Sequence, residues 1–224
     1  KNKISNNKAH NLVLFIDEKF NISNLKNHIS SSDYSLISDL IKTKDQKKKI
    51  LAFEISSKKK IILISLKKKI TNSDIENLGA NFYSKFKDSK IKLFIINSET
   101  LSSKQKNIAG YFAHGLKLKS YKFEKYKTKK DKGNISLNVA GKNIPSSKDQ
   151  LKFNSIEEGT FYTRDLVSEP GNVLHPDEYA RRIKSLSKFG LKIKIYDEKE
   201  LKKLGMNTLL GVGQGSIRGS YLVT

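Results

Sequence analysis

An α/β fold in two parts is predicted by three features of the sequence. Short apolar runs alternate with amphipathic segments, which is typical of strands that alternate with helices. A Pro/Ser/Lys stretch, KNIPSSKDQ at 142–150, interrupts the alternation. Beyond it the alternation resumes with few strands, too few for a complete second sheet. We expect a mixed-sheet α/β domain over 1–145, a connecting helix over 146–167 and the incomplete start of a second α/β domain over 168–224.

The first domain contains five segments with the composition of strands, and three helices are expected between them. The second and third strands are close enough in the chain to form a hairpin. The predicted strands are 11–16, 49–56, 59–66, 92–97 and 133–141. Apolar residues at helical spacing indicate the first helix. A Ser-x-x-Glu capping box indicates the start of the second helix, and a pair of serines indicates the start of the third. The three helices are expected around 36–41, from Ser73 (with Glu76) to about Lys87, and from Ser102 or Ser103 through Leu116.

The second part begins after the connecting helix, which must stop before Pro170. Pro176 in a first turn and Gly190 after a last turn delimit the next helix. A strand at 191–197, LKIKIYD, and a short helix in DEKELKKLGM follow. TLLGVGQG at 208–215 is predicted to be a strand or a turn, and SYLVT begins another strand.

The formal net charge of +22 raises the question of an anionic partner. Among 44 basic residues only four are arginine, the residue that grips phosphates with a bidentate fork: Arg164, Arg181, Arg182 and Arg218. The lysines are spread through every segment, so a compositional excess on solvated faces is favoured over a dedicated nucleic-acid surface. Such a field still favours weak, salt-sensitive nucleic-acid binding.

Several classes of protein are excluded or disfavoured by composition. The chain has no cysteine, which excludes disulfides and thiolate metal sites. Its apolar runs are far shorter than the roughly 20 residues of a membrane span, so we expect no membrane insertion. No leader pattern opens the chain, which favours the cytoplasm. The chain begins at Lys1 and stops within an apolar stretch, so we expect it to be a fragment of a longer protein.

Candidate site residues are few, and we assign none of them a catalytic, metal-binding or cofactor-binding role. The glycines of GVGQGSIRGS, 211–220, do not have the spacing of a dinucleotide or Walker loop and predict a tight turn. Asp165 and Glu169 could share a helix face, with Arg164 and the helix ends as ordinary partners. Ser216 has no nucleophile elbow around it. The histidines show no zinc-motif spacing, and an N-cap or packing role is expected for the last of them: His10, His28, His114 and His175.

The sequence from Tyr121 onward contains motifs that are specific to one protein family. FYTRDLVSEPGNVLHPDEYARRI, then a strand, then LGMNTLLGVGQGS before an apolar SYLVT, resembles the leucyl (cytosol) aminopeptidase family. YKFEKYKTKK at 121–130 is similar to another element of that family. Ser168 and His175 depart from its usual Asn and Thr. The matching residues are Arg164, Asp165, Leu166, Val167, Pro170, Asn172, Pro176, Leu204, Gly205, Met206, Leu210, Val212, Gly215 and Ser216.

The resemblance implies a macrodomain-like N-terminal domain followed by a metallopeptidase domain. It implies hydrolysis of N-terminal residues from peptides by two divalent metal ions, manganese or zinc, that activate a water. The family's metal-ligand motifs are absent from this sequence, so the metal site is expected after residue 224 and the segment itself is expected to be inactive. A homohexamer is implied for the full-length protein.

An alternative of a different class is a basic α/β binding module with nucleic-acid or nucleotide affinity. Macrodomain-type folds include ADP-ribose binders, although no glycine-rich diphosphate loop precedes Lys132. Lysines gathered on one face of the molecule would favour the nucleic-acid-binding alternative.

Overall fold

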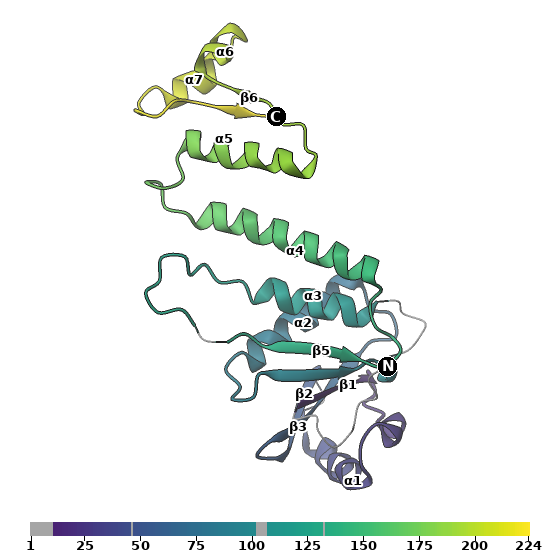
Figure 1. Ribbon diagram of the computed structural model, residues 1–224. Coiled ribbons are helices and arrows are strands. Elements are labelled where there is room, and N and C mark those ends of the chain that lie inside the picture. The colour runs from purple at the N-terminus through teal and green to yellow at the C-terminus, as the bar shows by residue number, and fades with distance from the viewer. Residues whose placement is uncertain (1–10, 46, 102–106, 132) are drawn as a thin grey trace. The chain divides into compact units, whose positions relative to one another are not determined.

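The computed structural model describes residues 11–45, 47–101, 107–131 and 133–224, which form two compact units (Figure 1). The sheet unit is Lys1–Phe161 and the C-terminal unit is Tyr162–Thr224. Each contains its own sheet, with five strands in the first and two in the second. The expected mixed α/β architecture is therefore confirmed.

The sheet unit is built on five strands in the order β2-β3-β1-β4-β5. β1, β3, β4 and β5 are parallel, and β2 pairs antiparallel with β3 as the predicted hairpin. Of the three inner strands, β1 and β3 are nearly continuous apolar runs because both of their faces are covered. The strands are β1 (Asn11–Asp17), β2 (Ile50–Ser56), β3 (Lys59–Leu66), β4 (Leu93–Asn97) and β5 (Ser136–Ala140).

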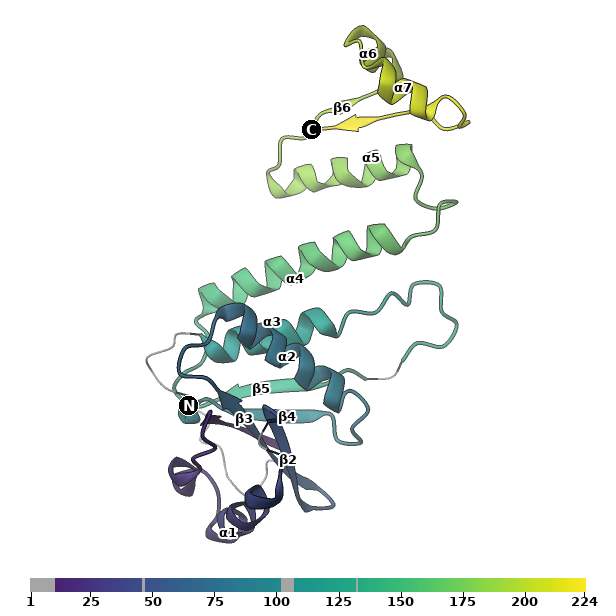
Figure 2. The same cartoon turned by 180° about the vertical axis from the view of Figure 1, so that it is seen from behind.

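Helices cover both faces of this sheet, so alternate residues of β1 enter two different cores (Figure 2). Val13 and Phe15 face α2 (Asn72–Phe86) and α3 (Ile108–Lys119). Leu12, Leu14 and Ile16 belong to the opposite core, together with Ile37 of α1 (Ser31–Leu40). Short 3-10 helices at Ser23–Asn27, Ile41–Thr43 and Ser98–Thr100 lie in the connections.

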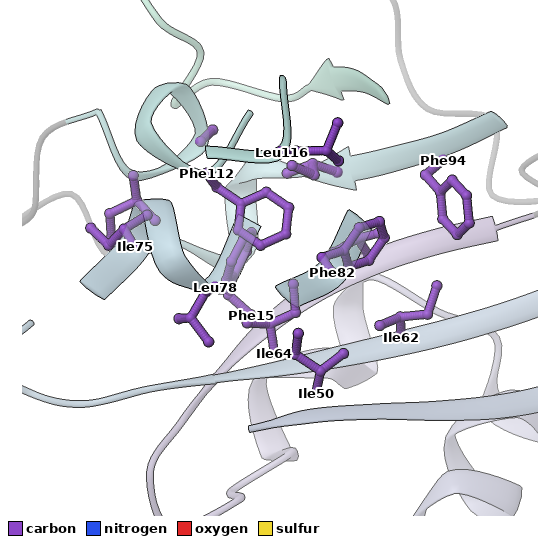
Figure 3. Close-up of a cluster of buried hydrophobic side chains, with 14 of the residues drawn as sticks. Phe15, Ile50, Ile62, Ile64, Ile75, Leu78, Phe82, Phe94, Phe112 and Leu116 are labelled. Carbon is purple, nitrogen blue, oxygen red and sulfur yellow. The ribbon is translucent and has the colours of Figure 1, made fainter. Parts of the chain in front are cut away.

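Aromatic side chains dominate the core under α2 and α3 (Figure 3). The Phe82 ring lies 5.1 Å from that of Phe94 and 5.4 Å from that of Phe112, both edge-on. The two helices approach so closely that a Cβ on Gly79 would overlap the carbonyl oxygen of Phe112. Glycine is required there by the distance between the backbones rather than by a turn.

The start of α2 corrects the sequence prediction. Thr71, not Ser73, is the N-cap residue, and its side chain accepts a hydrogen bond from the backbone N–H of Asp74 at 3.1 Å. Asp74 completes the capping box, so Thr-x-x-Asp is used in place of the overlapping Ser-x-x-Glu. The predicted start of the third helix at Ser102 or Ser103 falls outside the described residues.

The helix expected after the Pro/Ser/Lys stretch is α4 (Ser147–Ser168). Its first turns pack on the sheet unit, since the Phe153 ring lies 5.0 Å from both Tyr111 and His114. The boundary between the two compact units falls within this helix, after Phe161. None of the helices among the described residues is long and apolar enough to cross a membrane.

The C-terminal unit contains short elements. Gly190 ends the 3-10 turn after α5 with a φ of 87°, as its predicted place after the helix requires. The predicted strand at 191–197 is reduced to β6, which pairs antiparallel with β7. The prediction of a strand or turn at 208–215 is wrong for most of that stretch, which is helical as far as Gly213. The elements are α5 (Pro176–Lys184), β6 (Ile195–Tyr196), α6 (Glu198–Lys203), α7 (Asn207–Gly213) and β7 (Leu222–Val223).

Candidate functional site

An ionic network in the C-terminal unit joins the end of α4 to α5. Arg182 donates from Nη1 to Glu169 at 3.0 Å and from Nε to Glu178 at 2.7 Å. Arg181 donates from Nε and Nη2 to the two carboxylate oxygens of Glu178, at 2.6 and 2.7 Å. The Glu169 side chain is 1% exposed, so its charge depends on the Arg182 guanidinium. The network therefore fixes the loop at Pro170 against α5.

Three members of this network, Glu178, Arg181 and Arg182, have pKa values shifted so that they stay charged at neutral pH. Hydrogen bonds from Arg181 and Arg182 lower the pKa of Glu178 to about 2. Hydrogen bonds from Glu178 and Glu169 raise the pKa of Arg182. Because the carboxylates of Glu169 and Glu178 are engaged by guanidinium groups, the network acts as a scaffold.

Tyr162 is a residue of this unit that the sequence alone does not single out. Its hydroxyl is buried and has no hydrogen-bond partner among the residues that the structure describes. Burial raises the pKa of the phenol, against the opposing effect of Arg182. No sequence signal distinguishes this tyrosine from one that packs only through its ring.

The described residues do not fit a metal centre. Across 11–45, 47–101, 107–131 and 133–224, no three His, Asp or Glu side chains come together to hold an ion. The pair Asp165 and Glu169 does not converge on a ligand position, since Glu169 binds Arg182 and Asp165 lies exposed. One partner of Glu169 is thus Arg182 on α5, which lies 13 residues further along the chain.

Three of the four histidines lie within the described residues. His114 is buried in the sheet unit, where its Nδ1 lies 2.8 Å from Glu157 of α4. His28 Nδ1 lies 3.3 Å from Asn97 Nδ2. His175 is the N-cap residue of α5, as expected, but its ring contacts Asp177 instead of capping the helix. His10 falls outside the described residues.

The glycine-rich stretch at 211–220 begins in the last residues of α7 and continues as a turn at 214–215. A Cβ on Gly213 would overlap Ser220 Oγ, so the glycine allows the chain to pass close to itself. Ser216 Oγ accepts a hydrogen bond from the Arg218 backbone N–H at 3.0 Å, an ordinary turn contact.

A cavity of about 310 Å³ opens at the carboxyl ends of β1 and β3 in the sheet unit. No local sequence pattern indicates this cavity, because its walls come from segments far apart in the chain. Its lining is Phe15, Ile16, Asp17, Asn21, Asn24, Leu25, Leu66, Lys67, Lys68, Thr100 and Ile108.

Comparison with protein families assigns both units. The model described as "Cytosol aminopeptidase family, N-terminal domain" matches residues 13–130, and the one described as "Cytosol aminopeptidase family, catalytic domain" matches 161–224. The chain belongs to the cytosol aminopeptidase family.

Curated members of the cytosol aminopeptidase family align along most of the chain. A probable cytosol aminopeptidase of Nitrobacter winogradskyi is 32% identical over 226 residues, covering 95% of this chain and 45% of the relative. One from Sinorhizobium fredii is 44% identical over 123 residues, covering 51% of this chain and 25% of the relative. The chain therefore spans less than half the length of the curated relatives it matches.

Solved structures share the fold of this family member at low sequence identity. A tomato leucine aminopeptidase mutant has a TM-score of 0.76 at 19% identity, covering 100% of this chain and 49% of that one. The bottromycin maturation enzyme BotP, solved in complex with Mn, has a TM-score of 0.69 at 17% identity, covering 96% of this chain and 44% of that one. These likenesses agree with an N-terminal domain followed by the start of a catalytic domain.

The ionic network and the cavity lie in stretches that match different domains of the cytosol aminopeptidase family. The ionic network and Tyr162 lie in the stretch that matches the catalytic domain. The cavity lies in the stretch that matches the N-terminal domain.

Proposed function

We propose that the protein to which this chain belongs is a metal-dependent aminopeptidase that removes N-terminal residues from peptides. The match of residues 161–224 to the catalytic-domain model carries the proposal. The leucine aminopeptidase fold of the whole chain supports it. The cytoplasm, the compartment in the relatives' names, and a homohexameric assembly belong to the same proposal.

In this proposal two divalent ions, manganese or zinc, supply a polarised water and hold the substrate amine. BotP, solved with Mn, supports a divalent metal in this fold. Because the described residues hold no suitable cluster, we assign the metal ligands to catalytic-domain sequence that this chain does not contain. No step of the reaction is assigned to a residue of this chain.

The part of the catalytic domain that is present contributes structure. Arg182 bridges Glu169 and Glu178 and so holds the entry of the catalytic segment in one arrangement. A guanidinium suits this role because it stays charged and donates in two directions at once. We assign this network a positioning role that acts through the backbone of α5.

The test is an assay of the complete protein and of the 224-residue chain on a leucyl chromogenic amide with added Mn²⁺ or Zn²⁺. The complete protein is expected to release the leaving group steadily and to lose this activity with a chelator. The 224-residue chain is expected to show neither activity nor tight metal binding. An inactive complete protein with metal bound would contradict the proposed reaction, and chelator-sensitive activity in the short chain would contradict the assignment of the site.

A further inference from the structure

We propose that the cavity at the carboxyl ends of β1 and β3 binds a small organic anion, with an apolar body and one phosphate or carboxylate group. The cavity lies in the sheet unit, and the inference does not depend on peptidase activity. Four observations support it: the position of the cavity in the sheet, its lining, its charge and the fixed geometry of its walls.

The position is a topological switch point of the sheet. β1 and β3 are adjacent and parallel, with Asp17 beside Leu66 at their carboxyl ends. The chain leaves β1 toward α1, on one face, and leaves β3 toward α2, on the other. Loops that diverge from neighbouring parallel strands leave a crevice between them, which is where open α/β sheets bind ligands.

The lining combines an apolar floor with a polar rim. Phe15, Leu25 and Ile108 are buried side chains that form the floor. Two amides, a hydroxyl and charged groups form the rim: Asp17, Asn21, Asn24, Lys67, Lys68 and Thr100. A volume of about 310 Å³ is at the small end of ligand sites. This combination suits a small molecule with an apolar body and a polar end.

The charge of the rim favours an anion. Lys67 and Lys68 line the cavity, and Lys67 has no ion pair with another described residue. Asp17 opposes them, but its Oδ1 accepts hydrogen bonds from the backbone N–H groups of Lys19 and Asn21, at 3.1 and 2.9 Å. The carboxylate is thus used to hold the loop, while the Lys67 ammonium group remains for a bound phosphate or carboxylate.

The walls are held in place without a ligand. Thr100 Oγ1 accepts from the Phe15 backbone N–H at 3.0 Å and donates to the Asn97 carbonyl at 2.8 Å, which ties the end of β4 to β1. Asn21 Oδ1 accepts from the backbone N–H of Ser23 at 2.9 Å. A preorganised cavity requires little ordering on binding, which favours affinity for a small molecule.

The experiment is calorimetric titration of the 224-residue chain with phenyl phosphate, benzoate, inorganic phosphate and the uncharged benzamide. Saturable binding of phenyl phosphate or benzoate, with weaker binding of the uncharged probe, is the expected result. Comparison of the first two shows which anionic group is preferred, and inorganic phosphate shows whether the apolar body contributes.

A matched pair of variants locates the site. Lys67→Gln is expected to weaken binding about tenfold, the loss of one charge-assisted contact. Lys69→Gln removes the same charge two residues away, outside the lining, and is expected to leave binding unchanged. Equal weakening by both variants would show that the general positive field attracts the probes and would overturn the proposal. Failure of every anion to saturate below about 10 mM would overturn it as well.

Discussion

The sheet unit and the C-terminal unit differ in what stabilises them. The sheet unit has two apolar clusters, one on each face of a five-stranded sheet. In 162–224, all of which the structure describes, the buried apolar residues are Leu166, Ala180 and Leu201. Large apolar side chains instead lie exposed there, and they are Val167, Tyr179, Phe189, Leu191, Leu204, Met206, Val212 and Ile217.

The C-terminal unit relies on polar contacts where the sheet unit relies on burial. Arg182 bridges two glutamates, and Asp197 forms a capping box with Glu200 at the start of α6. Such contacts specify geometry but stabilise a partly exposed unit only modestly. Exposed apolar side chains on the helices and connections of this unit suit a unit that packs against further catalytic-domain sequence, as the proposed function requires.

The largest expected difference between the two units is the loss of stability when an apolar side chain is truncated to alanine. Phe82→Ala removes a fully buried ring between Phe94 and Phe112, and we expect it to cost about 3–5 kcal/mol of unfolding free energy. Val212→Ala, at a side chain that is 84% exposed, should change stability by less than about 0.5 kcal/mol. Urea denaturation measures the unfolding free energy of both variants. Comparable losses of stability would contradict the difference between a buried core in the sheet unit and exposed apolar side chains in the C-terminal unit.

The packing of α2 on α3 gives the next largest effect. Gly79→Ala places a methyl group against the Phe112 carbonyl, and we expect a loss of about 1–3 kcal/mol. Gly159→Ala in α4 is the matched control, since a Cβ there meets nothing within 4 Å. The control should gain about 0.5–1 kcal/mol from helix propensity. Thermal denaturation of both variants decides the point, and stabilisation by both would show that α2 and α3 are not in backbone contact.

A smaller, pH-dependent effect is expected in the C-terminal unit. The folded-state pKa of Glu178 is about 2, below its ordinary value of 4.5. A depressed carboxyl pKa contributes stability that is present above the ordinary pKa and lost as pH falls toward the folded value. Glu178→Gln should therefore reduce hydrogen-exchange protection of α5 at neutral pH, and this difference should vanish near pH 2.

The control for that measurement is Glu158→Gln, which removes an exposed carboxylate from α4. It should leave α5 protection unchanged at each pH. A pH-independent effect of Glu178→Gln would indicate that the side chain acts through packing rather than through its charge.

Local patterns predicted elements well where one interaction dominates. β3 has its predicted bounds because an unbroken apolar run fits an interior strand. α2 was predicted at the wrong cap because Thr71 with Asp74 and Ser73 with Glu76 are overlapping capping signals, and local sequence does not rank them. At 208–215, apolar residues between glycines are compatible with the period of a strand and with that of a helix, and the chain is helical as far as Gly213.

Long-range contacts were not predictable in the same way. Glu157 with His114 and Arg182 with Glu169 join segments whose proximity follows from the fold. The cavity also depends on strand order, since adjacent strands β1 and β3 are separated in the chain by α1 and β2. The motif residues at 164–176 indicated the family without indicating which of them are ion-paired.

Hydrogen exchange on the 224-residue chain tests most directly whether the two units differ in autonomy. We expect strong protection of amides in Ile61–Leu66, where every side chain except that of Leu66 is buried, because exchange there requires opening of the five-stranded sheet. Amides in Leu191–Asp197 and Leu209–Val212 should exchange much faster, because few apolar contacts hold them. Equal protection in the two units would contradict this account, since the C-terminal unit would then be stable without further catalytic-domain sequence.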